Sequence, residues 1–229
     1  MNQNYKPHKN LDRNMGEIAR VCVYCGSSPG NDPDLMRAAT RFGEILADNG
    51  VGLVYGGGAS GLMGAIAAAV QARGGDIIGI IPEFLTEREN MFTGAHELVV
   101  TRDMHERKQR MFDEADAFVA LPGGVGTLEE VVEQMTWAQL GRHQKPILLA
   151  NIQKFWDPLC ALLDHMEELQ FIRPGLAVDY LVAERVDDIL PMLKVGGPVE
   201  VSGYWVTATA TGQNELRPVT SVDPIPDSR

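Results

Sequence analysis

Short apolar segments rich in β-branched residues alternate with segments of helical periodicity along most of this chain of 229 residues. Between residues 33 and 49, for example, apolar side chains recur every three or four positions, and Gly50 then marks the end of a helix. Because the strand segments are apolar throughout, they belong in a parallel sheet that is covered on both faces. Right-handed crossovers then predict an α/β fold with a doubly wound parallel sheet, a Rossmann-like three-layer sandwich.

The same patterns predict the positions of the elements and the organisation of the chain. We expect strands at 20–24, 51–55, 76–81, 96–101, 117–121, 146–150 and 181–183. We expect helices at 33–49, 62–73, 104–114, 127–140, 155–169 and 186–193. The chain then divides into a polar N-terminal arm (1–17), a Rossmann-like domain (18–195) and a C-terminal extension (196–229) that is partly disordered. Residues 199–211 could form an edge strand or a hairpin.

Composition excludes several classes of protein. The formal net charge of −11 argues against a nucleic-acid partner, which requires a basic face. We expect neither a signal peptide nor a membrane helix, because no apolar stretch has the required length or position. Three cysteines are too few for a disulfide scaffold, which favours the cytoplasm. Cys22 and Cys25 form C-x-x-C within a strand, where they should face opposite sides of the sheet as structural residues. The histidines lack ligand spacing, so we expect no metal.

Three strands are each followed by a glycine-rich loop, at 25–30, 56–61 and 122–127. In a parallel sheet these loops meet at the carboxyl edge, where ligands bind, and each begins a helix whose free N–H groups favour anions. The loops are therefore predicted to bind a phosphate or nucleotide, although tight strand-to-helix turns would give the same pattern. The residues expected to contact phosphate are Gly26, Ser27, Gly57, Gly58 and Gly123.

The second loop matches a dinucleotide fingerprint. Gly56, Gly58 and Gly61 give G-x-G-x-x-G, and Glu83 at the end of the next strand could contact a ribose. The fingerprint belongs on the first βαβ unit, however, and this loop follows the second strand. An NAD(P)-dependent oxidoreductase is therefore the weaker alternative.

Charged residues stand at the start of two predicted helices, and each set can be explained either as a helix cap or ion pair or as part of a ligand site. Thr127 and Glu130 have the spacing of a capping box, yet a carboxylate beside a glycine loop could also face a bound sugar. Asp103 and Glu106 also fit a capping box, which leaves Arg107 near the positive end of the helix dipole.

Arg107 and Lys108 could meet an anion at this edge of the sheet. Alternatively, Asp103 with Arg107 and Glu106 with Arg110 could form ion pairs on a solvated helix face.

The segment PGGVGTLEE resembles the P-G-G-x-G-T-x-x-E signature of the LONELY GUY family, cytokinin riboside 5'-monophosphate phosphoribohydrolases formerly mislabelled lysine decarboxylases. VCVYCGSSPG, LVYGGGASGLMGAIA and MHERKQRM stand in the family's order and spacing, and the resemblance spans about residues 19–195. It implies that the domain at 18–195 is a nucleotide-binding catalytic domain and that Arg107 and Glu130 form the catalytic pair. It implies substrate contacts at Glu89, Lys108, Gly124, Val125, Gly126, Thr127, Leu128, Glu129 and Thr136. The plant form has Tyr in place of Val125.

The resemblance implies hydrolysis of the N-glycosidic bond of a nucleoside 5'-monophosphate, releasing an adenine-type base and ribose 5-phosphate. Such a reaction passes through an oxocarbenium-like state that a carboxylate stabilises, and it requires no metal or organic cofactor. The resemblance also implies a homodimer with sites near the interface. A non-catalytic nucleotide or cofactor carrier on the same fold is the alternative. For Gly124 we expect a turn with positive φ that a larger residue would strain.

Overall fold

The computed structural model describes residues 18–86, 90–172 and 179–195, together with three short strands between 199 and 218. The expected N-terminal arm and the last eleven residues, 219–229, lie outside the described residues.

Seven parallel strands form one sheet in the order β4-β3-β2-β1-β5-β6-β7, so β1 lies in the centre between β2 and β5. The strands are β1 (Arg20–Tyr24), β2 (Gly52–Tyr55), β3 (Ile77–Pro82), β4 (Glu97–Thr101), β5 (Ala117–Ala120), β6 (Ile147–Ala150) and β7 (Leu181–Ala183). The chain runs outward from β1 to β4 and then returns to the other side of β1 as β5. This reversal is the switch point at which open α/β sheets bind ligands.

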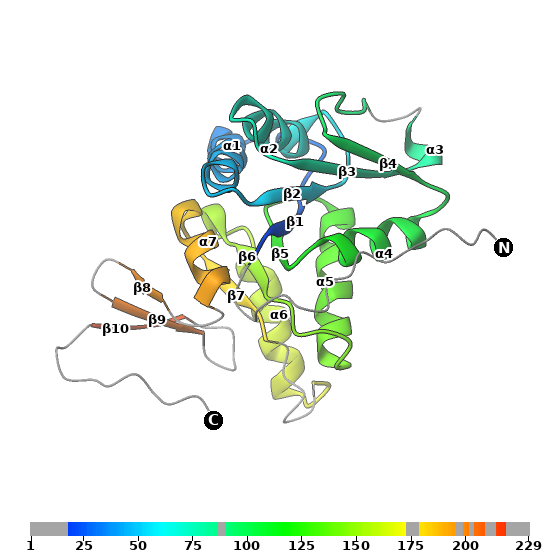
Figure 1. Cartoon of the computed structure of the whole chain (residues 1–229). Helices are drawn as coiled ribbons and strands as arrows, with labels where there is room; N and C mark the ends of the chain where they lie inside the picture. The colour runs from blue at the N-terminus through cyan, green and yellow to red at the C-terminus, as the bar shows by residue number, and fades with distance from the viewer. Residues whose placement is uncertain are drawn as a thin grey trace.

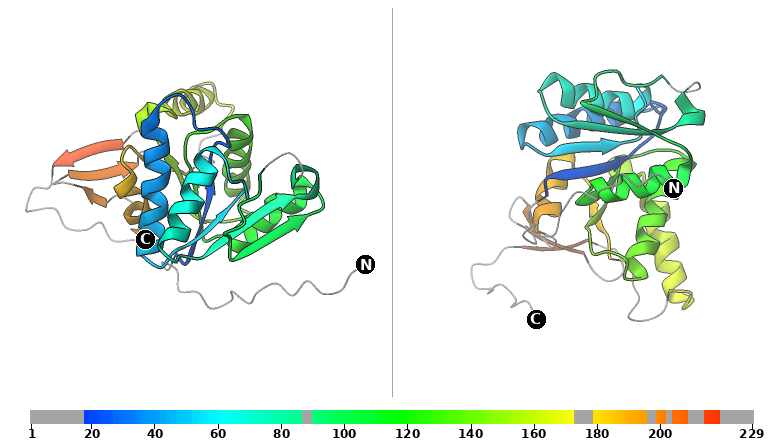
Figure 2. Two further views of the ribbon diagram at one scale, coloured as in Figure 1. Left: turned by 90° about the horizontal axis from the view of Figure 1, so that it is seen from above. Right: turned by 45° about the vertical axis from the view of Figure 1, so that its right-hand side comes forward.

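Helices cover both faces of the sheet (Figures 1 and 2). Along β1, Val21 and Val23 pack into the core shared with α1 (Pro33–Asp48), α2 (Gly61–Ala72) and α7 (Val186–Val195). Cys22 and Tyr24 face the other core, shared with α4 (Met104–Glu114), α5 (Val125–Gln139) and α6 (Asp157–Glu168). The predicted three-layer sandwich is therefore confirmed.

Several boundaries differ from the prediction. Helix α5 begins at Val125, two residues earlier than predicted, and the extended residue Gly124 is its N-cap in place of Thr127. Two short helices, α3 (Glu83–Thr86) and η1 (Ile152–Lys154), were not predicted. The C-terminal strands β8 (Val199–Val201), β9 (Tyr204–Ala208) and β10 (Asn214–Pro218) form a separate antiparallel sheet beside α7 (Figure 1). The alternative of an edge strand in the main sheet is therefore wrong, and the alternative of a hairpin is confirmed by β8 and β9.

The cysteines are structural, as predicted. Cys22 and Cys25 are free, buried and in different cores, and burial raises the pKa of both thiols. Among the described residues, no helix combines the length and apolar character needed to cross a membrane.

Candidate functional site

The three glycine loops meet at the carboxyl edge of the sheet, as predicted. They follow β2, β1 and β5, which are neighbours. Gly26 joins them: its N–H donates to the Pro122 carbonyl at 3.1 Å, and its own carbonyl accepts from the Leu62 N–H at 3.0 Å. The first loop is thus fixed to both of the others through backbone bonds.

Several of these glycines are required by the contact between loops. A Cβ on Gly26 would lie 3.3 Å from the Cα of Gly123. Gly61 has a φ of +58°, and a Cβ there would overlap the backbone of Ser27. Gly124 and Gly126 differ, because a Cβ on either would meet no atom within 4 Å. The expectation of a positive φ at Gly124 is wrong: its φ is −90°, an ordinary extended value.

The N-terminus of α5 is the helix start best suited to an anion. Helix α1 is capped by the Asp32 carboxylate, which accepts from the Asp34 N–H at 2.8 Å. In the first turn of helix α2, the Leu62 N–H donates to the Gly26 carbonyl. Helix α5 has Gly124 at its N-cap, no side-chain cap and no acidic residue in its first turn. Its N–H groups and dipole therefore face the open space beside Gly124 and Gly126.

The loop that matches the dinucleotide fingerprint is covered by another part of the chain. The Ala59 N–H donates to the Asn90 carbonyl at 2.7 Å, and the Phe92 N–H donates to the Gly57 carbonyl at 3.0 Å. Gly58 forms an isolated bridge with Met91. The Ala59 N–H, and the Leu62 N–H at the start of α2, are thus already used within the chain and are not free for a pyrophosphate, which weighs against the oxidoreductase alternative.

Arg107 on α4 and Glu130 on α5 form a buried ion pair. The Arg107 Nη1 lies 2.8 Å from the Glu130 Oε1, and the two residues are 9% and 8% exposed. The Arg107 Nε donates to the Ile80 carbonyl within β3, at 3.0 Å. The capping interpretation of Glu130 is therefore wrong, because α5 begins earlier and the carboxylate turns to Arg107 instead of the helix start.

The other charged residues of α4 have partners that differ in part from the prediction. The Asp103 carboxylate accepts from the Glu106 N–H at 2.8 Å, which confirms Asp103 as the cap. The expected ion pair of Asp103 with Arg107 is not formed. Glu106 bonds to Arg102 at 2.9 Å, and Arg110 pairs with Glu114, so the expected pair of Glu106 with Arg110 is also wrong.

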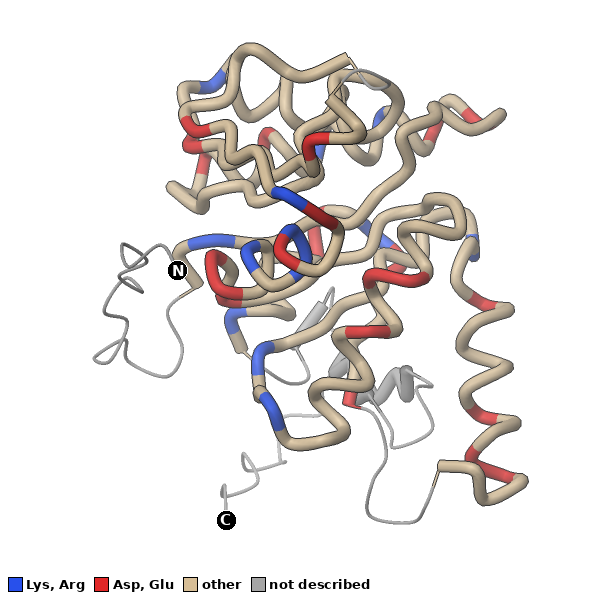
Figure 3. Tube along the Cα trace, turned by 90° about the vertical axis from the view of Figure 1, so that its right-hand side faces the viewer, with Lys and Arg blue, Asp and Glu red and all other residues tan. Residues whose placement is uncertain are grey.

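Lys108 links α4 to α5. Its Nζ lies 2.6 Å from the Glu129 Oε1 and 2.9 Å from the Glu133 Oε1. In Figure 3 basic and acidic segments lie close together on α4. Lys108 does not line the cavity described next, and the contacts that the structure gives its Nζ are these two ion pairs.

Burial raises the pKa of the Glu130 carboxyl, and the neighbouring Arg107 cation opposes this shift in part. Burial disfavours the ionised carboxylate because water is excluded, whereas an adjacent cation favours it. A carboxylate with these two influences is suited to exchange a proton with a substrate or a water molecule.

The ion pair and the glycine loops line one cavity of about 250 Å³. The lining residues include the predicted Gly26, Ser27, Arg107, Gly124, Gly126, Thr127, Glu129 and Glu130. They also include Tyr24, Met63, Leu85 and Met104, which the sequence analysis missed. Met63 and Met104 lie in the first turn of their helices, directly after the loops at this edge. That position in the sequence could have identified them as lining residues.

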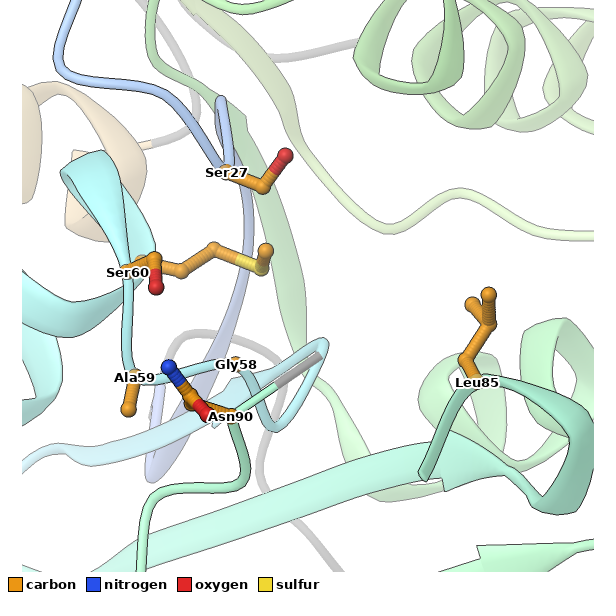
Figure 4. A pocket seen from close by; sticks show the side chains of 7 residues that line it. Ser27, Gly58, Ala59, Ser60, Leu85 and Asn90 are labelled. Atoms are coloured by element: carbon orange, nitrogen blue, oxygen red, sulfur yellow. The ribbon is translucent and has the colours of Figure 1, made fainter. Parts of the chain in front are cut away.

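A second cavity of about 390 Å³ adjoins the first (Figure 4). The two share Ser27, Met63 and Leu85, and Figure 4 shows Leu85 opposite Ser27 across the opening. The second cavity is otherwise lined by the backbone of the second loop and by Asn90 and Ser60.

Other predicted site residues are not found in the lining of the cavity that contains the ion pair. Glu89 is outside the described residues. Thr136 is exposed on α5, and its hydroxyl donates to the Val132 carbonyl at 2.8 Å. Val125 and Leu128 are also exposed on α5 and line neither of these two cavities. Gly58 lines the second cavity.

Gly57 packs against β3 and Gly123 against Thr127. In the part of the chain that the structure describes, no three His, Cys, Asp or Glu residues are grouped so that they could hold a metal.

Comparison with known proteins identifies relatives of the whole fold. A family model described as "Possible lysine decarboxylase" matches residues 63–193. A rice protein named "Probable cytokinin riboside 5'-monophosphate phosphoribohydrolase LOGL5" is 39% identical over 210 residues, covering 91% of this chain and 85% of that protein. The Arabidopsis thaliana protein "Cytokinin riboside 5'-monophosphate phosphoribohydrolase LOG7" is 43% identical over 164 residues, covering 72% and 76%.

Solved structures share the fold at lower identity. The molybdenum cofactor binding protein from Rippkaea orientalis has a TM-score of 0.59 and 19% identity, over 78% of this chain and 97% of that chain. At this identity the likeness shows the fold alone. The family model matches more than half of the chain and the rice relative covers most of it, so the chain belongs to the LONELY GUY (LOG) family.

Proposed function

We propose that this protein hydrolyses the N-glycosidic bond of cytokinin-type nucleoside 5'-monophosphates and releases an adenine-type base and ribose 5-phosphate. The observation that carries the proposal is the buried ion pair of Arg107 and Glu130, 2.8 Å apart, in a cavity that also holds an uncapped helix start. The names of relatives at 39% and 43% identity support the same reaction.

The 5'-phosphate is assigned to the start of α5. The N–H groups beside Gly124 and Gly126 are accessible, and the helix dipole favours an anion there. The net charge of −11 would oppose a phosphate at most places on the chain, so a site built from backbone N–H groups is a suitable solution. Ser27 and Thr127 line the same cavity and can add hydroxyl donors.

Glu130 is assigned the chemical role. As the bond from the ribose C1′ to the base breaks, the base takes the electron pair and positive charge develops on the ribose. The ionised carboxylate stabilises that charge and accepts a proton from the water that attacks C1′; this proton then passes to the departing base, which leaves in its neutral form and regenerates the carboxylate. Arg107 orients the carboxylate and lowers its pKa against the effect of burial, so that the ionised form is available.

We further propose a homodimer formed through α5. Val125, Leu128, Val132 and Leu140 form an exposed apolar stripe along the helix, with Val125 82% and Leu140 76% exposed. Thr136 lies within the same stripe, so a second copy packed there could bring Thr136 toward its neighbour's cavity. Light scattering after gel filtration tests the oligomeric state, and a monomer in solution would refute this part of the proposal.

We assign the protein to the cytoplasm. Three free cysteines, two of them buried in the cores, suit a reducing compartment in which thiols stay reduced. Fractionation of cells, with detection of the native chain by antibody, tests the assignment.

The decisive experiment incubates the purified protein with AMP and with isopentenyl-AMP and separates the products by chromatography. Release of free base together with ribose 5-phosphate supports the proposal. Tight binding of either nucleotide without any release would favour the carrier alternative, and bound NAD(P) in the ultraviolet spectrum would favour the oxidoreductase.

A further inference from the structure

The guanidinium of Arg107 is held on several sides. Its Nε donates to the Ile80 carbonyl at 3.0 Å, and its Nη1 lies 2.8 Å from the Glu130 carboxylate. The pairing of β2 with β3 ends at Tyr55 and Gly79, so Ile80 lies one residue beyond the shared ladder. The Arg107 side chain thus bonds to β3 just beyond the point where β3 stops pairing with β2.

Gly56 is the first residue after β2, and it faces the remaining side of the guanidinium. A Cβ placed on Gly56 would lie 2.5 Å from the Arg107 Nη2 and 3.0 Å from the Met63 Sδ. Real Cβ atoms do not approach other heavy atoms to 2.5 Å, so one of the groups would have to move. The thioether of Met63 ends a flexible side chain and can yield. The guanidinium cannot yield without losing one of its two bonds.

The backbone gives no separate reason for glycine at this position. Gly57 and Gly61 in the same loop have positive φ, whereas Gly56 is not among the residues with positive φ. Its backbone therefore accepts an L-residue, and the constraint on position 56 is the space that Arg107 occupies.

We propose that Gly56 is a positioning residue for the hydrolysis: its missing side chain leaves the space in which the Arg107 guanidinium stands while it holds Glu130. The first glycine of the G-x-G-x-x-G run thus leaves space for an arginine side chain from α4 and does not bind a nucleotide phosphate. This inference rests on the proposed function for its kinetic consequence, but not for its geometry.

The test is the variant Gly56→Ala with AMP as substrate. A displacement of about 1 Å in a catalytic group can cost about 100-fold in rate, so we expect kcat to fall 10-fold to 100-fold. The KM for AMP should change less than about threefold, because the phosphate is assigned to α5 and not to this loop. The matched control is Gly52→Ala at the first residue of β2, where a Cβ meets the Arg20 Cγ at 3.1 Å, at the opposite end of the strand from Gly56 and the site. That variant should keep the wild-type kcat.

A double-mutant cycle separates positioning from general damage. In the background Arg107→Lys, which has no Nη2, Gly56→Ala should cause no further loss of kcat. An equal loss in both backgrounds, or an unchanged kcat in the single variant, would overturn the inference. If Gly56→Ala alone fails to fold, the double variant should fold again because the clash is gone, and failure of both would also refute the proposal.

A second measurement does not depend on activity. The Arg107 Nε–H, bonded to a buried carbonyl, should give a protected signal in NMR spectra of the wild type, and Gly56→Ala should shift or remove it. If the wild-type protein releases no base, the proposed function fails, and this signal alone then decides the inference. A signal that is identical in the two proteins would refute it.

Discussion

Replacement of Glu130 by Gln is the perturbation that most directly tests the chemistry. The amide has the size of the carboxyl group, and its Oε1 can still accept from the Arg107 Nη1 at about the 2.8 Å of the native bond. It carries no negative charge and cannot accept a proton from water. The change therefore removes the proposed chemical role and leaves the shape of the cavity intact.

The effect on stability should be small. The amide still accepts a hydrogen bond from the charged guanidinium, a class of bond that contributes about 1.5–3 kcal/mol, but the buried Arg107 cation loses its counter-charge, so we expect a cost on the order of 1 kcal/mol. Removing a carboxylate that is 8% exposed offsets part of this cost, because burial already disfavours its charge. At about 2–4 °C per kcal/mol for a chain of this size, Tm should change by no more than about 4 °C.

The effect on catalysis should be large. Loss of a general base lowers turnover by about 10²–10⁴, which corresponds to roughly 2.7–5.4 kcal/mol in the activation free energy. The affinity for AMP should be preserved, because the phosphate contacts lie at the start of α5.

The assay measures base release by chromatography, AMP affinity by calorimetry and Tm by differential scanning calorimetry. The control Glu130→Ala leaves Arg107 buried without its partner and should cost about 3–5 kcal/mol in stability. Normal turnover by Glu130→Gln would show that the carboxylate has no chemical role and would refute the mechanism.

Four other outcomes follow from the same site. Because burial raises the pKa of Glu130, the acidic limb of kcat/KM should lie above the ordinary carboxyl value of about 4.3, and Arg107→Gln should move it still higher; a limb at or below that value would contradict the assignment. Lys108→Gln should lower Tm by about 2–4 °C and leave KM within about threefold, whereas a KM rise above tenfold would make Lys108 a substrate contact. Gly124→Val should fold normally, since its φ is −90° and a Cβ has open space, but AMP affinity in calorimetry should fall at least about tenfold; unchanged affinity would remove this loop from the site. Val132→Glu should give a monomer by light scattering if α5 forms the dimer interface, and an unchanged dimer would place the interface elsewhere.

The fold was largely predictable because its signals are local or follow from topology. The strand segments are apolar on both faces, which requires a covered parallel sheet, and β1 matches its predicted bounds at Arg20–Tyr24. The meeting of the glycine loops followed from the same rule, since all strands of a parallel sheet end at one edge. The C-terminus shows the limit of this reasoning, because residues 199–211 alternate too loosely to choose between an edge strand and a hairpin. The structure contains the hairpin, formed by β8 and β9, and β10 was not predicted.

The ion pair was harder to predict from the residues alone. Thr127 and Glu130 satisfy the local pattern of a capping box, and within one helix that pattern is a sufficient explanation. The structure resolves the ambiguity through tertiary contact: Glu130 is buried, and a buried carboxylate needs a cation or several donors. Arg107, 23 residues earlier on another helix, is that cation. The resemblance to a known family, not the spacing, had joined the two residues.

The glycines show most clearly why a sequence pattern can locate a binding region correctly without giving the role of each residue in it. Gly57 and Gly61 are needed for positive φ, and Gly26 for the contact between two loops. Gly56 leaves space for a guanidinium, and Gly124 leaves a helix start open. Glycine is thus required for a different physical reason at each position: a positive φ, a close contact with another part of the chain, or an open helix start. The spacing G-x-G-x-x-G suggested a pyrophosphate because one fold uses it so; here the neighbours of each glycine, and not the spacing, decide what it does.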